Sequence, residues 1–71
     1  MINGERLRSL RKQRGATQRA IAKDIGVTEN SVLRFELGLA NAKLGTVVAL
    51  ADLFNVSVDY LIGRSDNPQR I

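Results

Sequence analysis

Residues 17–37 read TQRAIAKDIGVTENSVLRFEL and contain two short helical patterns separated by a tight turn. Thr17 and Thr28 each stand directly before one of these patterns. A threonine hydroxyl at that position can accept a hydrogen bond from a free N–H group of the first helical turn. Gly26 lies between the patterns, where a positive φ would cost a residue with a side chain about 1 kcal/mol or more. The stretch therefore predicts two helices that cross steeply.

Such a close approach requires a small residue on the first helix and buried apolar residues on the second. Ala22 lies one turn before Gly26, and Val32 and Phe35 are three residues apart, so that both can face a core. The spacing that is typical of a helix-turn-helix motif comprises Gln18, Ala22, Gly26, Val32 and Phe35. The outer side of the second helix is then left to Glu29, Asn30, Leu33 and Arg34.

The rest of the chain also shows helical spacing, and no segment sustains the alternation of a strand. Gly15, Gly38 and Gly63 each follow such a segment and can end a helix. The predicted helices span residues 5–13, 18–24, 29–37, 46–54 and 58–62. Because helices this short are unstable alone, we expect an all-α fold with one compact five-helix domain over residues 1–64. Residues 65–71 are mostly polar and are predicted to form a flexible tail.

Composition argues against an enzyme. The 71 residues include no cysteine and no histidine, which excludes disulfides, thiolate metal sites and histidine-based catalysis. No cofactor or metal is expected. The lack of cysteine is typical of a reducing compartment, and no apolar run approaches the ~18 residues of a membrane span.

Charge is distributed unevenly. Residues 1–23 carry seven arginine or lysine residues and one acid, whereas residues 24–71 carry four basic and six acidic residues. A basic half favours a polyanionic partner, either nucleic acid or an anionic membrane surface. Solvated helix faces would give the same composition.

Five stretches resemble the Cro and lambda-repressor type of helix-turn-helix regulator. They are ERLRSLR (5–11), TQxxIA (17–22), IGVT (25–28), FExG (35–38) and VSVDYLIG (56–63). The similarity covers residues 3–64. It implies a five-helix domain that binds operator DNA as a dimer, with its third helix in the major groove.

The resemblance implies that four side chains reach base edges: Thr28, Glu29, Asn30 and Arg34. Arginine can pair with guanine and asparagine with adenine, each with about 1–3 kcal/mol of discrimination. Thr28 could instead act only as a helix cap, and Glu29 could accept from cytosine or only repel a phosphate. Arg34 could form an ordinary ion pair along its helix, but no carboxylate stands three or four residues away.

The resemblance also implies phosphate contacts, at the start of the second helix and in the loop after the third. The residues are Thr17, Gln18, Arg19, Asn41 and Lys43. Independently, the free N–H groups and the dipole at a helix N-terminus attract an anion near Gln18. Gln18 could also be a plain surface residue. Lys43 replaces the small hydroxyl residue that would cap the fourth helix.

In the family that the chain resembles, an arginine and an acid at the positions of Arg11 and Glu36 tie the first helix to the third. We interpret this pair as structural rather than as a DNA contact.

Three leucines depart from the family pattern, because many relatives carry polar or basic residues there. Leu33, Leu37 and Leu39 could form an exposed apolar strip that serves as a protein interface, including the dimer interface. They could instead edge the core, or Leu33 could touch a thymine methyl group.

These observations predict a sequence-specific transcriptional regulator, a bacterial or phage repressor that binds double-stranded DNA as a homodimer. Its expected location is the cytoplasm, in association with the nucleoid. An antitoxin that regulates its own operon, or a restriction-modification controller, would have the same features. A protein-interaction module that has lost DNA binding is the alternative from a different class, since the apolar strip would suit a protein partner.

Overall fold

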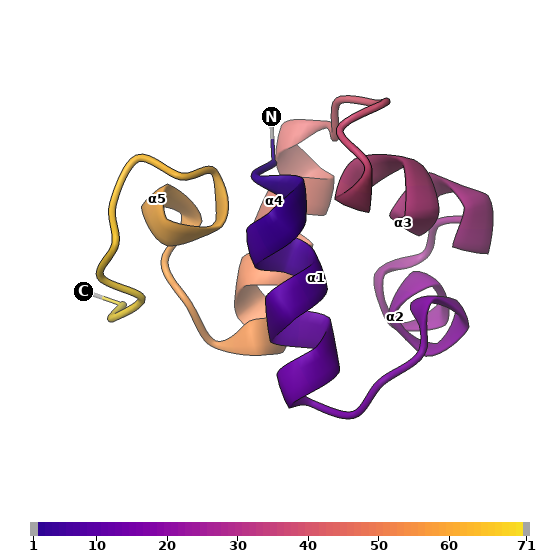
Figure 1. The fold of residues 1–71 in the computed structure, drawn as a ribbon, viewed down its shortest axis with the longest axis horizontal. Coiled ribbons are helices and arrows are strands. Elements are labelled where there is room, and N and C mark those ends of the chain that lie inside the picture. Colours follow the sequence, from indigo (N-terminus) through magenta and orange to yellow (C-terminus); the bar gives the residue numbers. More distant parts are fainter. Residues whose placement is uncertain (1, 71) are drawn as a thin grey trace.

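This computed structural model describes residues 2–70 of the chain. These residues form five α-helices joined by loops, and no strand. The helices are α1 (Gly4–Gln13), α2 (Gln18–Ile25), α3 (Glu29–Glu36), α4 (Leu44–Phe54) and α5 (Val58–Leu61). In Figure 1, α1 and α4 lie at the centre, α2 and α3 on one side, and α5 with the C-terminal segment on the other. The predicted all-α, five-helix architecture is confirmed.

Four of the five helices begin with a side chain that satisfies a free backbone N–H group. The capping residues are Asn3, Thr17, Thr28 and Ser57, and each accepts a hydrogen bond from the backbone N–H three residues further on. Lys43 precedes α4 and makes no side-chain cap. Side-chain capping therefore sets most of the helix starts, and the two caps that the sequence analysis names, Thr17 and Thr28, are among them.

Five of the ten helix bounds match the predicted ones, and the other five differ by one or two residues, with the largest difference at α4. This helix begins at Leu44 rather than at residue 46. The Val47 N–H donates to the carbonyl oxygen of Lys43 at 3.0 Å, and Val47 is almost completely buried. Packing of the first turn thus outweighs the low helix propensity of Gly45.

One hydrophobic core joins all five helices. Each helix contributes at least one completely buried side chain, and the largest of these are Leu7, Ile21, Val32, Leu50 and Leu61. Burying a side chain of this size stabilises a fold by about 1.5–3 kcal/mol. No helix can leave this core without exposing its buried side chain. The five helices therefore form a single packed unit that positions the interface described below.

The turn between α2 and α3 has the predicted form. Gly26 adopts φ +76°, and its N–H together with that of Val27 bonds to the carbonyl oxygen of Ala22. Ala22 is only 3% exposed, which agrees with its prediction as the small residue at the crossing. This left-handed residue turns the chain, and Thr28 caps the next helix two residues later. α2 and α3 therefore form a helix-turn-helix.

The start of α1 lies against the end of α3. A Cβ atom added at Gly4 would stand 2.3 Å from the carbonyl oxygen of Glu36 and 2.6 Å from that of Phe35. Only glycine leaves room for two backbones at this distance. Gly4 therefore sets how closely the first helix approaches the third.

The C-terminal segment runs back along α5 and bonds to three helices. The Arg6 guanidinium stacks 4.1 Å from the centroid of the Tyr60 ring and donates to the carbonyl oxygen of Ser65 at 2.9 Å. The Ser57 N–H donates to the carbonyl oxygen of Pro68, and Arg70 pairs with a carboxylate of α4. The flexibility expected of residues 65–71 stays a prediction. None of the helices within residues 2–70 has the length and apolar character needed to cross a bilayer.

Candidate nucleic-acid interface

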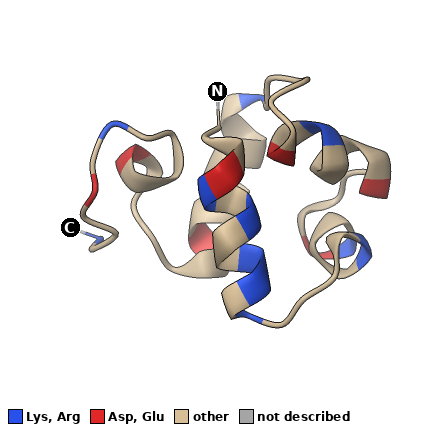
Figure 2. Cartoon of the chain, in the orientation of Figure 1, with Lys and Arg blue, Asp and Glu red and all other residues tan. Residues whose placement is uncertain are grey.

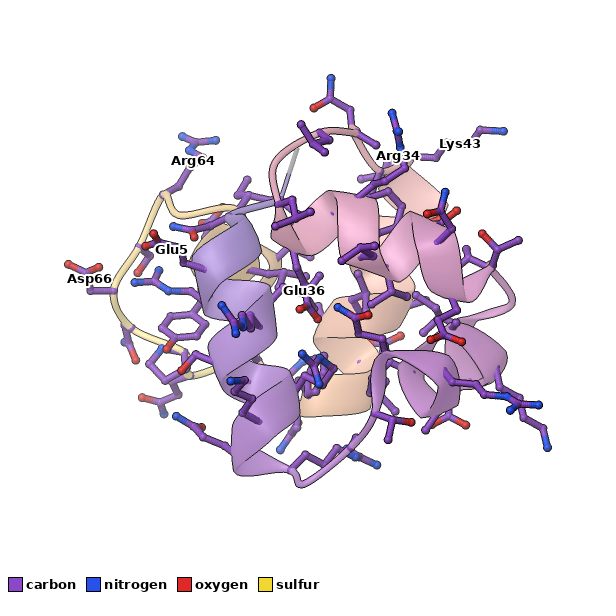
Figure 3. The ribbon with its side chains drawn as sticks, turned by 45° about the vertical axis from the view of Figure 1, so that its right-hand side comes forward. Glu5, Arg34, Glu36, Lys43, Arg64 and Asp66 are labelled. Atoms are coloured by element: carbon purple, nitrogen blue, oxygen red, sulfur yellow. The ribbon has the colours of Figure 1, made fainter. Side chains whose placement is uncertain are left out.

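The outer edge of α3 is polar and exposed. Glu29, Asn30 and Arg34 project from it into solvent, whereas Val32 and Phe35 on the opposite side are buried in the core. Figure 3 shows Arg34 and Lys43 pointing away from the body of the molecule, while Glu36 points inward toward α1. The helix thus has a buried anchoring side and a free polar side that can meet a ligand.

Thr28 is held by two hydrogen bonds at the start of this edge. Its Oγ1 accepts from the Ser31 N–H at 3.1 Å and lies 2.9 Å from the Ser31 hydroxyl. The capping role is therefore occupied, and Ser31 restrains the hydroxyl further. Sequence reasoning did not single out Ser31. Its position three residues after the cap, where a side chain can reach back to the capping residue, was the available signal.

The side chain of Arg34 makes one hydrogen bond within residues 2–70, from Nη2 to the carbonyl oxygen of Leu39 at 3.3 Å. It has no carboxylate partner within residues 2–70, as the sequence around it predicts. A guanidinium carries five N–H donors, so most of its bonding capacity is available to a ligand.

The start of α2 faces the same region. Thr17 Oγ1 accepts from the Ala20 N–H at 3.0 Å, so it caps the helix and still has its own hydroxyl proton to donate. Gln18 is half-buried, and its Nε2 donates to Glu36 Oε1 at 3.2 Å. The amide nitrogen has a second hydrogen that can be donated elsewhere. Arg19 is exposed.

Arg11 and Glu36 join α1 to α3 beneath this surface. Arg11 Nε donates to Oε2 at 2.6 Å and Nη2 to Oε1 at 3.1 Å, which is the bidentate arrangement of a strong ion pair. The Glu36 side chain is only 3% exposed. The hydrogen bond with Glu36 raises the pKa of the Arg11 guanidinium, and burial lowers it by a smaller amount. A guanidinium stays protonated in proteins, so the pair joins a positive to a negative group.

Some of the arginine and lysine side chains in residues 1–23 bond to other parts of the protein, and the others are exposed to solvent. Arg6, Arg11 and Arg14 donate to backbone carbonyl oxygens at 2.9, 3.1 and 2.8 Å. The four remaining cations are exposed and make no side-chain hydrogen bond within residues 2–70; they are Arg8, Lys12, Arg19 and Lys23. Figure 2 shows these basic residues along α1 and α2. Composition alone could not separate the two groups.

Asn41 and Lys43 lie exposed in the loop between α3 and α4. In Figure 3 Lys43 points away from the body of the molecule. The loop after α3 therefore carries one exposed cation.

The comparison with known proteins agrees with this geometry. A family profile described as a helix-turn-helix domain matches residues 4–61. The chain belongs to this helix-turn-helix family. The family and the fold are those of DNA-binding transcriptional regulators and not of enzymes.

Two relatives and one solved structure illustrate the helix-turn-helix similarity. The chain is 39% identical over 64 residues to the uncharacterized HTH-type transcriptional regulator YobD of Bacillus subtilis, an alignment that covers 90% of this chain and 57% of YobD. It is 36% identical over 61 residues to the cryptic phage CTXphi transcriptional repressor RstR of Vibrio cholerae, covering 86% and 55% of the two chains. The P22 c2 repressor, crystallised with a synthetic operator, superposes with a TM-score of 0.85 at 28% identity, covering 92% of this chain and 98% of that one. The chain thus spans little more than half the length of the two relatives.

Three leucines at the end of the helix-turn-helix unit are exposed. Leu33, Leu37 and Leu39 are 39%, 60% and 61% exposed, so they do not belong to the core. Leu44 and Val48 are also exposed, at 75% and 41%, and were not predicted to be. Their spacing of four residues on α4 was the available signal, but α4 is apolar on several sides, and the sequence does not show which side faces inward.

Proposed function

We propose that this helix-turn-helix protein is a sequence-specific transcriptional repressor that binds an operator as a dimer, with α3 in the major groove. The observation that carries the proposal is the exposed polar edge of α3, held outward by the rigid turn after α2 and by the Thr28 cap. Two copies would cover half-sites about one helical turn apart and exclude polymerase. This activity would be cytoplasmic and associated with the nucleoid.

Base reading is assigned to Thr28, Glu29, Asn30 and Arg34. Arg34 would pair with guanine and Asn30 with adenine, because their forked donor and acceptor groups match those base edges. Glu29 would accept from a cytosine amino group. Thr28 would contribute less to base reading, because its hydroxyl already caps α3 and lies within hydrogen-bond distance of the Ser31 hydroxyl.

Phosphate binding is assigned to Thr17, Gln18, Arg19, Asn41 and Lys43, at the two ends of the reading edge. The second amide hydrogen of Gln18 and the free N–H groups of α2 provide donors beside a positive helix end. Arg19 and Lys43 add charge. Contacts of this kind hold the protein in register without reading sequence.

Selection of bound sequences from a random duplex pool tests the proposal. A palindromic consensus is the expected outcome, because a two-fold dimer reads two equivalent half-sites. Affinity for random DNA should fall as salt rises, with a log–log slope of about 0.9 for each phosphate contact. Failure to bind any duplex at low salt would contradict the proposal and favour a protein-interaction module, for which the exposed leucines would be the docking surface.

Arg34→Ala and Gln18→Ala should affect DNA binding differently. Arg34→Ala is expected to remove about 1–3 kcal/mol of discrimination at one base position, with less effect on random DNA. Gln18→Ala should weaken binding to all duplexes about equally. Anisotropy titrations on the selected site, on single-base variants and on random DNA measure both. An equal loss on every duplex for Arg34→Ala would exclude it as a reading residue.

We further propose that Leu33, Leu37 and Leu39 contribute to the contact between two copies of the chain. Leu37→Lys places a charge on the more exposed of the two leucines in α3 and its C-cap, and should therefore shift the protein toward monomer. Molecular mass measured by light scattering over a micromolar concentration series, with Lys12→Ala as a surface control, tests this. Identical masses for the wild type and Leu37→Lys at every concentration would exclude the strip as the interface.

A further inference from the structure

The end of α3 is closed by a complete hydrogen-bonded turn. Gly38 adopts φ +72°, its N–H bonds to the carbonyl oxygen of Phe35 at 3.2 Å, and the Leu39 N–H bonds to that of Arg34 at 2.8 Å. This is the Schellman arrangement, in which a left-handed residue reverses the chain and satisfies the last helical carbonyl groups. Leu39 is thereby fixed beside Arg34.

The side chain of Arg34 uses the same turn. Its Nη2 donates to the carbonyl oxygen of Leu39, so Leu39 receives a hydrogen bond from the side chain of Arg34 and gives one to its backbone. The two bonds form a closed ring between one residue of the helix and one residue beyond it. A long arginine side chain on an exposed helix edge otherwise samples many rotamers.

We infer that the Gly38–Leu39 turn is a positioning element that orients the Arg34 guanidinium for base reading. This inference rests on the proposed function, because it assigns a source of specificity to the same surface. A guanidinium that is already oriented loses less rotational freedom on binding, and its fork meets a base edge at a defined angle. The same turn leads into the loop that carries Asn41 and Lys43. A phosphate contact made by that loop would therefore also affect the orientation of the Arg34 side chain.

Backbone conformation is the feature that the experiment must change. A Cβ atom at Gly38 would have no neighbour within 4 Å, so a substitution there acts only through its positive φ. Alanine disfavours that region, whereas asparagine tolerates it. Gly15 is a matched control, because it has φ +69° and an equally open surrounding but lies between α1 and α2, away from Arg34.

The experiment compares discrimination between the selected duplex and a duplex altered at the single base pair whose preference Arg34→Ala removes. Six proteins are titrated at a temperature where circular dichroism shows all of them to be folded. They are the wild type, Gly38→Ala, Gly38→Asn, Gly15→Ala, Arg34→Ala and the double variant Arg34→Ala with Gly38→Ala. Gly38→Ala is expected to reduce discrimination about 3- to 10-fold, with its affinity for random DNA within about 2-fold of wild type. Gly38→Asn and Gly15→Ala should each stay within about 2-fold of wild-type discrimination.

The double variant separates positioning from general damage. If Gly38 acts through Arg34, then Gly38→Ala should cause no further loss once Arg34 is alanine. Wild-type discrimination in Gly38→Ala, an equal loss in Gly15→Ala, or additive losses in the double variant would each overturn the inference and leave the proposed function standing. A wild-type protein that discriminates between no duplexes would overturn the proposed function, and the inference with it.

Discussion

Glu36→Ala is expected to lower the free energy of unfolding by about 3 kcal/mol, because it leaves the Arg11 guanidinium partly buried without its partner. The two side chains are only 14% and 3% exposed, and both carboxylate oxygens are engaged. Gln18 would also lose the acceptor of its amide hydrogen. Urea denaturation followed by circular dichroism measures the change.

The ion pair between Arg70 and Asp52 provides a matched control. It has the same N–O distance of 2.6 Å, but its side chains are 41% and 59% exposed. Asp52→Ala should therefore cost less than about 1 kcal/mol. The double variant Arg11→Met with Glu36→Leu should be more stable than Glu36→Ala, since it removes both buried charges. Equal effects of Glu36→Ala and Asp52→Ala would contradict a structural role for the buried pair.

Gly4→Ala is expected to destabilise the fold by about 3 kcal/mol, at the upper end of the range for overpacking. The added Cβ would lie 2.3 Å from one carbonyl oxygen of α3 and 2.6 Å from another. Backbone atoms cannot rotate away as the end of a side chain can, so α1 must move from α3. In a domain of this size, such a loss lowers the melting temperature by well over 10 °C, at about 4–8 °C per kcal/mol.

Gly45→Ala is the control with the opposite expected sign. Gly45 is also helical, but a Cβ atom there would meet nothing within 4 Å. Alanine should therefore stabilise α4 by about 0.5–1 kcal/mol. Melting curves of both variants test the pair of predictions. A Gly4→Ala protein as stable as the wild type would show that α1 does not need its close approach to α3.

The two-helix unit was predictable because its signals are local. Thr17 and Thr28 cap N–H groups three residues away, and Gly26 ends α2 by its own φ angle. Interactions within four residues of one another depend little on the rest of the molecule. The same locality made it possible to predict that Arg34 lacks an acidic partner along its helix.

Contacts between distant residues could not be derived in this way. The roles of Gly4 and Arg6 depend on segments more than thirty residues away. The pairing of Arg11 with Glu36 was expected only from the family resemblance. No residue spacing indicates that Gln18 donates to Glu36. These contacts appear only when the helices have packed.

By itself, the sequence determined the five helices, the turn at Gly26 and the polar edge of α3, because capping, helical periodicity and a left-handed glycine act over a few residues. Only the tertiary structure decided which arginines are bound internally, which leucines stay exposed and how closely α1 approaches α3. Those outcomes depend on the relative positions of helices, and the shape of the shared core sets these positions.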